Sequence, residues 1–402
     1  MNRIIEGNEA AAYISYAFTE IASIYPITPS STMAELIDQW STEGRKNIFG
    51  NTVQVTEMQS EAGAAGTLHG TLKAGALATT YTASQGLLLM IPVMYKLAGE
   101  FLPAVFHVSS RALTTNALSI FGDHSDVMAV RQTGFILLAE SSVQEVMDLS
   151  AVAHLAAIKL SMPVLNFFDG FRTSHELQKI EMISYEKLAS LLPKYELEQF
   201  RKKSMNPNHP TVSGTNQDPD IHFQQRETVN KKYMEAPETI EYYMQQINSI
   251  RGTNYSLVDY YGLDNAEEII ISIGSVSNTI QQVVEELNRS GRKVGHLNVH
   301  LYRPFPIQKI KEVVPKTVKK IAVLDRSKEP GAGGEPLLLD IKNTFYDSEA
   351  RPIIIGGRYG LGSKDVTPGQ IVAVYNQLLL PKEQLKDNFT IGIIDDITYP
   401  LC

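Results

Sequence analysis

The sequence contains almost no cysteine. Its 402 residues include a single one, Cys402, which is the last residue of the chain. The chain therefore cannot form an internal disulfide, and it cannot hold a zinc ion or an iron–sulfur cluster through several cysteines. One thiol is typical of a reducing compartment. Because the first ten residues also lack the apolar core of a signal peptide, we expect a cytoplasmic protein.

Long apolar runs and basic clusters are scarce too. The longest apolar stretch, 86–95, is too short to span a bilayer and is soon interrupted by Lys96 and Glu100. The net charge is -8, and the most basic patch, 201–203, is short. Since nucleic-acid binding usually needs a clustered basic face, we expect neither nucleic acid nor membrane among the partners.

The chain does contain enough apolar material for two domains. Hydrophobic residues make up 43% and charged residues 20%, as in soluble globular proteins. In the first part, apolar spacing predicts alternating helices and strands. The predicted helices span 8–22, 32–40 and 143–160, and the predicted strands span 24–27, 53–56, 76–82, 104–109 and 163–168. This alternation, with nearly continuous apolar strands, predicts an α/β fold whose parallel sheet is covered by helices on both faces.

The pattern weakens between residues 178 and 248. The stretch 204–220 is rich in Pro, Asn, Gly and Asp, which predicts an irregular arm over about 178–248, anchored to a partner domain or subunit. A short helix is expected at 237–249. A second α/β unit begins near Tyr255, with predicted strands at 268–273, 293–299, 319–324 and 353–355 and predicted helices at 279–287, 306–314 and 367–379.

Glu61 stands at the head of a segment of small residues. The run E-A-G-A-A-G from Glu61 leaves no bulk beside the carboxylate, so another backbone or a flat ring could approach it closely. This pattern makes the segment a candidate site for a planar cofactor. A simpler interpretation also fits, because an acid in the first turn of a helix is favoured by the helix dipole and small residues serve helix packing. The segment by itself leaves both interpretations open.

Four polar side chains follow predicted strands directly. Thr28, Glu61, Ser84 and Arg111 each lie just past a strand of the first unit. Ligands of parallel α/β sheets bind beyond the carboxyl ends of the strands. The shared position therefore strengthens the prediction of a binding site that includes these residues.

Two further segments carry weaker signals. The glycine-rich segment 356–364 follows a strand, but Ser363 precedes Lys364, which is the wrong order for a phosphate-binding loop. The segment Asp123–His124–Ser125–Asp126 offers ligand types for a metal, although ligands so close in sequence rarely converge on one ion. We interpret 123–126 as an active-site loop or a hydrogen-bonded turn.

Several long strings of the sequence are specific enough to identify a family. They include Y-P-I-T-P-S-S from Tyr25, E-M-Q-S-E-A-G-A-A-G from Glu57, T-A-S-Q-G-L-L-L-M-I-P from Thr82, A-L-S-I-F-G-D-H from Ala117, F-F-D-G-F-R-T-S-H-E from Phe167, L-D-R-S-K-E-P-G from Leu324 and G-R-Y-G-L-G-S-K from Gly357. Through these strings the chain resembles the N-terminal part of the pyruvate:ferredoxin (flavodoxin) oxidoreductases. The resemblance extends to about Asp396.

The resemblance implies a fold, a reaction and three site residues. Residues 1–252 would form the domain that binds the pyrimidine of thiamine diphosphate, and 253–402 a domain like the C-terminal domain of transketolase. The family oxidises pyruvate with coenzyme A to acetyl-CoA and CO2 and passes electrons to ferredoxin or flavodoxin. By position, Glu61 would bond the aminopyrimidine ring of the cofactor, and Arg111 and Thr28 would bind the pyruvate carboxylate.

The family's remaining parts are not found in this sequence. There is no G-D-G motif for the diphosphate and Mg2+, and the cysteines of the iron–sulfur clusters are absent. We therefore expect a fragment, a truncated product or one subunit of a split enzyme that is inactive alone, binds the remaining domains and forms a homodimer. A related oxidoreductase of another 2-oxoacid and a non-catalytic scaffold remain alternatives.

Overall fold

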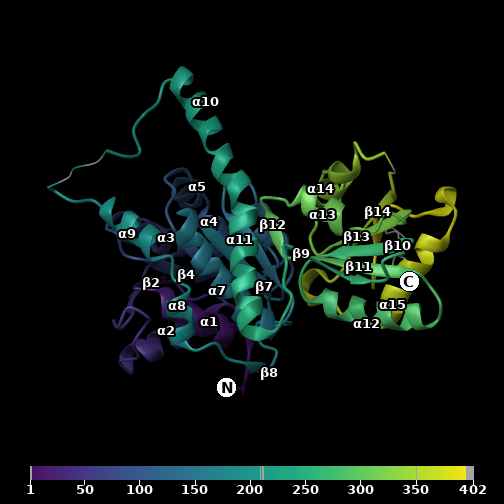
Figure 1. Ribbon diagram of the computed structural model, residues 1–402, viewed down its shortest axis with the longest axis horizontal. Helices are drawn as coiled ribbons and strands as arrows, with labels where there is room; N and C mark the ends of the chain where they lie inside the picture. The colour runs from purple at the N-terminus through teal and green to yellow at the C-terminus, as the bar shows by residue number, and fades with distance from the viewer. Residues whose placement is uncertain (1, 209, 211, 350, 395–402) are drawn as a thin grey trace.

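The computed structural model describes residues 2–394 except 209, 211 and 350, so the expectations about Asp396 and Cys402 lie outside it. Two α/β units lie side by side (Figure 1). Both have mainly parallel sheets, which confirms the predicted fold class. No helix of the described chain is both long and apolar enough to cross a membrane.

The first unit is built on a seven-stranded sheet. Its order is β12-β6-β7-β5-β4-β2-β3, and every strand is parallel to its neighbour except β12. The central strands are buried along their whole length, which explains their continuous apolar sequence. The strands span Ile21–Ile24 (β2), Gln54–Glu57 (β3), Ala78–Thr82 (β4), Val105–Ser110 (β5), Ile136–Glu140 (β6), Val164–Asp169 (β7) and Leu301–Arg303 (β12).

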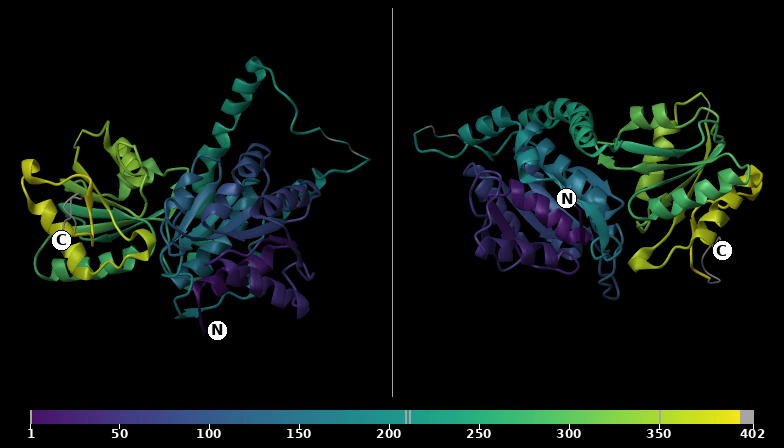
Figure 2. Two further views of the ribbon diagram at one scale, coloured as in Figure 1. Left: turned by 180° about the vertical axis from the view of Figure 1, so that it is seen from behind. Right: turned by 60° about the horizontal axis from the view of Figure 1, so that its bottom comes forward.

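Helices of this unit form two packed groups around the sheet (Figure 2). In one group α1 contacts α7, and α7 contacts α11; in the other, α3, α4 and α5 contact one another. The bounds are Gly7–Phe18 (α1), Ser31–Thr42 (α2), Glu61–Lys73 (α3), Ser84–Leu89 (α4), Ile91–Gly99 (α5), Ser125–Ala129 (α6) and Val143–Leu160 (α7). A separate antiparallel pair joins Asn2–Ile5 (β1) to Gln178–Glu181 (β8).

The second unit has a six-stranded sheet with the order β15-β14-β13-β10-β11-β9. Only β9 runs antiparallel to its neighbour. Its strands span Val258–Gly262 (β9), Glu268–Ser272 (β10), Val294–Val299 (β11), Lys320–Asp325 (β13), Ile353–Arg358 (β14) and Phe389–Thr390 (β15). Its helices span Val276–Arg289 (α12), Ile307–Val313 (α13), Pro336–Phe345 (α14) and Pro368–Leu379 (α15), with short 3-10 turns at Leu361–Ser363 (η1) and Lys382–Gln384 (η2).

The prediction of a helix over 8–22 was wrong at its end. Helix α1 ends at Phe18, Thr19 is extended, and the strand β2 begins at Ile21 rather than at Ile24. Apolar residues over 21–24 continue the helical spacing, but they pair with β3 and β4 instead. Periodicity alone does not separate a short buried strand from a helix end.

The predicted irregular arm over about 178–248 was also wrong, because most of it is regular. It contains β8 and four helices, Tyr185–Ser190 (α8), Lys194–Lys202 (α9), Pro219–Thr228 (α10) and Asn230–Arg251 (α11). Helix α10, the first turns of α11 and the described parts of the connection from α9 extend away from the unit (Figure 1). Helix α11 continues through Pro237, where one backbone hydrogen bond is lost. Its apolar face packs on α7, and such tertiary packing overrides local preference.

Candidate functional site

The carboxyl ends of four adjacent strands meet at one edge of the first sheet. The sheet order β3-β2-β4-β5 brings together the residues that follow these strands. Glu61 follows β3, Thr28 follows β2, Ser84 follows β4 and Arg111 follows β5. The four residues that the sequence placed after separate strands therefore share this edge.

Glu61 occupies the first turn of α3. Ser60 caps the helix, its side chain accepting a hydrogen bond from Gly63 N. The side chain of Glu61 turns inward, and the residue is only 6% exposed. Within the described chain no group donates a hydrogen bond to its carboxyl group. A buried polar group normally has a partner, so this carboxyl group is available to a ligand.

Gly86 of α4 lies directly against Glu61. A Cβ atom on Gly86 would stand 2.6 Å from Glu61 Oε1 and 2.8 Å from Glu61 Cγ. Real Cβ atoms do not approach so closely, so the Glu61 side chain can hold this position only because residue 86 lacks a side chain. The small residue that matters most for Glu61 is thus in α4, and the small-residue segment of α3 did not indicate it.

Arg111 points toward the loop that follows β2. Its Nη1 donates a hydrogen bond of 2.8 Å to the backbone carbonyl of Thr28. Its Nε is buried and donates to no acceptor in the part of the chain that the structure describes. Burial lowers the pKa of Arg111, while Asp126 and Glu61 act in the opposite direction. A buried guanidinium with a free donor is suited to a carboxylate.

Thr28 contributes to this contact through its backbone. The residue is exposed, and its carbonyl oxygen accepts the bond from Arg111. The structure therefore brings Thr28 and Arg111 into direct contact, and the electrostatic influence of Glu61 on Arg111 places the acid in the same neighbourhood.

Asp126 joins two of the strand ends. Its Oδ2 accepts from Ser84 N at 2.7 Å and from Arg111 N at 3.0 Å, while its Oδ1 accepts from Val127 N at 2.8 Å. The residue is fully buried, and burial raises its pKa to about 7. The hydrogen-bonded turn predicted over 123–126 is present, since Asp123 Oδ1 accepts from Ser125 N. No pattern in the sequence indicates that Asp126 reaches the ends of β4 and β5.

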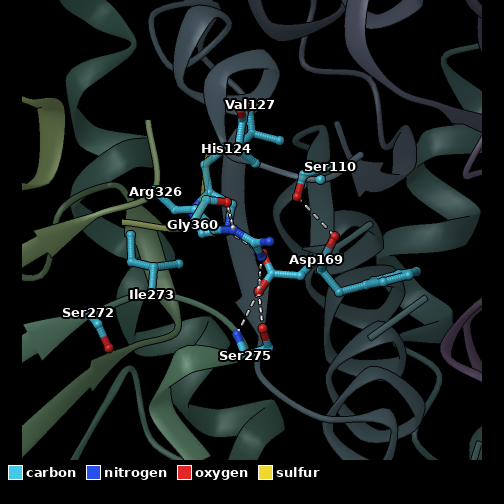
Figure 3. Close-up of polar contacts among 12 residues, drawn as sticks. Ser110, His124, Val127, Asp169, Ser272, Ile273, Ser275, Arg326 and Gly360 are labelled. Carbon is cyan, nitrogen blue, oxygen red and sulfur yellow. Dashed lines mark hydrogen bonds and ion pairs between the residues drawn. The ribbon is translucent and has the colours of Figure 1, made fainter. Parts of the chain in front are cut away.

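A second polar cluster lies where the two units meet (Figure 3). Asp169, at the end of β7, is paired with Arg326 of the second unit at 2.8 Å and with His124 at 2.6 Å. Ser275 N, just before α12, donates to Asp169 Oδ2 at 2.8 Å. Burial alone would raise the pKa of Asp169, but Arg326 and His124 hold it well below its usual range. Asp169 is therefore an ionised, buried link between the units.

The segment 356–364, which was considered for phosphate binding, also lies at this junction. Ser363 Oγ accepts from Gly122 N, and Ser363 N donates to Gly122 O, each at 2.8 Å. Asp123 accepts from Gly362 N at 3.3 Å. The segment 356–364 therefore forms hydrogen bonds with the loop that precedes α6.

Two known families match successive parts of the chain. "Pyruvate flavodoxin/ferredoxin oxidoreductase, thiamine diP-bdg" matches residues 13–245. "Pyruvate:ferredoxin oxidoreductase core domain II" matches residues 266–371. The first match covers more than half of the chain and includes the whole edge that carries Thr28, Glu61 and Arg111.

Similar curated proteins are much longer than this chain. The pyruvate-flavodoxin oxidoreductase of Klebsiella pneumoniae is 60% identical over 99% of the chain and 34% of its own length. The pyruvate:ferredoxin oxidoreductase of Moorella thermoacetica is 54% identical over 98% of the chain and 34% of its own length. The chain thus spans about a third of these relatives and corresponds to their N-terminal part.

Solved structures share the fold. A 2-oxoglutarate:ferredoxin oxidoreductase from Magnetococcus marinus has a TM-score of 0.69 at 19% identity, covering 96% of this chain and 65% of that one. A split-gene transketolase has a TM-score of 0.51 at 8% identity, covering 93% and 96%. The strings quoted from the sequence, the matched families and the relatives agree, and the chain belongs to the pyruvate flavodoxin/ferredoxin oxidoreductase family.

Proposed function

We propose that this chain forms one half of the active site of a pyruvate:ferredoxin or pyruvate:flavodoxin oxidoreductase. The complete enzyme would oxidise pyruvate with coenzyme A to acetyl-CoA and CO2 and pass the electrons to ferredoxin or flavodoxin. In this proposal residues 1–252 hold the aminopyrimidine ring of thiamine diphosphate and the substrate carboxylate. Residues 253–402 form the transketolase C-terminal-like domain, although β12 from this part pairs with the first sheet.

The observation that carries the proposal is the Glu61 carboxyl group. It is buried, it accepts no hydrogen bond from any described residue, and it lies against the glycine surface of Gly86. A planar ring bearing a basic nitrogen would supply the missing partner of this carboxyl group. The residues present therefore fit the aminopyrimidine of thiamine diphosphate.

Glu61 would act as a proton-holding group at the ring nitrogen. When bound, thiamine diphosphate supplies a carbon nucleophile that attacks the keto carbon of a 2-oxoacid and stabilises the charge left by decarboxylation. Glu61 holds or shares a proton at the ring nitrogen, and its burial excludes water that would compete for that proton. Such proton handling contributes about 10²–10⁴-fold to rate in enzymes generally.

Arg111 and Thr28 would bind and orient the substrate. The planar guanidinium of Arg111 has donors left over after its bond to Thr28 O, and these suit the carboxylate of pyruvate. Thr28, which is exposed, would offer its hydroxyl as a further hydrogen-bonding group for the substrate. Both residues would bind the carboxylate that all 2-oxoacids share, so both would serve pyruvate and its larger homologues alike.

The other components belong to partners in this proposal. Mg2+, the diphosphate site, the iron–sulfur clusters, coenzyme A and the electron acceptor would be bound by the remaining two thirds of the enzyme, as the length of the relatives suggests. We expect the assembled enzyme to be a homodimer. The chain on its own would not reduce a viologen dye with pyruvate.

The test uses a chimera in which this chain replaces the matching third of the Klebsiella pneumoniae relative. Glu61→Gln should slow exchange of the thiazolium C2 proton, measured by proton NMR in D2O after acid quench, by about a hundredfold. Glu43→Gln, an exposed change of the same charge at the end of α2, should leave it unaltered. Equal exchange in both variants would remove the role assigned to Glu61.

Two further measurements separate the alternatives. A comparison of kcat/KM for pyruvate and for larger 2-oxoacids in the chimera identifies the substrate. Viologen reduction by the chain alone would contradict the half-site assignment. An inactive chimera that folds and binds no thiamine diphosphate would instead favour a scaffold.

A further inference from the structure

We propose that Arg326 of the second unit is a positioning residue for Arg111, acting through Asp169, His124 and Asp126. The inference rests on the proposed substrate role of Arg111, which Arg326 itself does not contact. In this proposal, a residue of the second unit influences the reaction at the site in the first unit. The connection is made in three steps, each through buried side chains.

The first step ties Asp169 to the second unit. Arg326 Nη1 lies 2.8 Å from Asp169 Oδ2, and both side chains are almost fully buried. Arg326 is itself held, since its Nε donates to Gly360 O at 3.0 Å. Ser275 donates to the same carboxylate through its backbone N and its hydroxyl (Figure 3). The carboxylate of Asp169 is therefore held in place by groups of the second unit.

Close approach of the backbone supports this step. A Cβ on Gly274, which has a φ of +82°, would lie 3.0 Å from Asp169 Oδ2 and 3.2 Å from His124 Nε2. The turn between β10 and α12 therefore packs against both members of the pair. A bulky side chain at 274 would push them apart.

The second step connects Asp169 to the start of α6. His124 stands at the residue before α6 and bonds Asp169 Oδ1 through Nε2 at 2.6 Å. His124 N also donates to the backbone carbonyl of Arg326 at 2.8 Å. The N-terminal end of α6 is therefore fixed twice by Arg326, once directly and once through Asp169.

The third step connects α6 to the backbone of Arg111 in the candidate site. Asp126 lies two residues after His124 and accepts from the backbone N of both Ser84 and Arg111. A shift of α6 would break these bonds, since hydrogen bonds weaken steeply with distance and angle. Arg111 would lose its fixed backbone, and the turn that begins α4 and carries Gly86 would lose its anchor. The second unit thereby sets the orientation of the substrate-binding arginine.

The experiment compares two buried arginine–aspartate pairs by hydrogen exchange in the full chain. Arg326→Gln removes the side-chain part of the proposed link, its ion pair with Asp169, while the bond from His124 N to the backbone carbonyl of residue 326 remains. Arg251→Gln removes the pair Arg251–Asp148, which has the same N–O distance of 2.8 Å and the same side-chain exposures of 3% and 0% but no hydrogen bond to α6. We expect exchange at the amides of Ser84 and Arg111 to rise about tenfold or more in Arg326→Gln, as for a lost bond to a charged group, and to stay unchanged in Arg251→Gln.

Additional variants keep the result interpretable. Asp126→Asn should expose the same two amides directly, and Arg326→Lys, which retains the charge, should restore part of the protection. If Arg326→Gln does not fold, Ser275→Ala removes a donor to Asp169 and should give a smaller rise at the same amides. Faster exchange after Asp126→Asn but not after Arg326→Gln, or equal effects of Arg326→Gln and Arg251→Gln, would overturn the proposal.

The measurement does not depend on any ligand. Amide exchange in the chain can show the link even if Arg111 binds no 2-oxoacid, whereas the substrate role is tested by kinetics in the chimera. The two failures are therefore distinguishable.

Discussion

The carboxyl group of Glu61 rests on the backbone of Gly86, so closely that a Cβ on residue 86 would lie 2.6 Å from Glu61 Oε1. The contact joins the first turn of α3 to the first turn of α4. Because both helices start at strand ends of the same sheet, the acid and the glycine are held by the sheet itself.

Gly86→Ala should therefore displace Glu61 with little effect on the fold. In the chimera we expect C2-proton exchange to slow by about tenfold or more, because a misplaced catalytic group costs rate steeply. The control is Gly63→Ala in α3, whose Cβ would meet nothing closer than 3.5 Å. Slower exchange in both variants would show that any added methyl group in this region has the effect.

Arg111→Lys should weaken substrate binding. A lysine cannot keep the bond to Thr28 O and also present a planar pair of donors to a carboxylate. We expect KM for pyruvate in the chimera to rise by about tenfold, equivalent to roughly 1.4 kcal/mol, with a smaller change in kcat. Arg289→Lys on the exposed side of α12 is the control, and a normal KM in Arg111→Lys would argue against carboxylate binding.

His300 should make stability depend on pH in the alkaline range. Burial alone would lower its pKa, but Asp259 at 3.0 Å, with Glu145 and Ala139 O, raises it to about 9. The unfolded value is about 6.5, so the stabilisation is complete below that pH and is lost as the pH rises through 9. We expect the free energy of unfolding, measured in urea, to be lower at pH 9.5 than at pH 6 by on the order of 2–3 kcal/mol.

Two variants check the assignment to His300. His300→Gln should remove most of the loss in the free energy of unfolding between pH 6 and pH 9.5. His107→Gln should not, because burial lowers the pKa of His107 to about 3, and it is neutral throughout the range. An unchanged slope in His300→Gln would assign the pH dependence to another group.

Arg45 should stabilise the first unit through aromatic rings. Its guanidinium carbon lies 4.3 Å from the ring centre of Trp40 and 4.9–5.4 Å from those of Tyr13, Tyr16 and Tyr185. Arg45→Met should lower the free energy of unfolding by about 1–2 kcal/mol. Fluorescence of Trp40, the single tryptophan, reports the transition. Arg201→Met removes one ring contact together with the ion pair to Glu20; a loss in Arg45→Met smaller than the loss in Arg201→Met would exclude the cluster as a main source of stability.

Local errors in the sequence interpretation have a common origin. The end of α1 and the helices α8, α9 and α11 were misjudged because each depends on packing, whereas α10 buries none of its residues. The residues over 21–24 pair with β3 and β4, and α11 packs along α7. Spacing and breakers in a short window carry no information about such neighbours.

The sequence by itself determined the α/β class, the family and the strand ends at which Thr28, Glu61 and Arg111 stand. These follow from residue patterns within a few positions, because apolar runs of strand length and the polar residues after them are local properties. Only the tertiary structure decided that Gly86 supports Glu61, that Asp126 joins Ser84 to Arg111, and that Asp169 meets Arg326. Those pairs are separated by many residues and are brought together by sheet order and by the packing of two units.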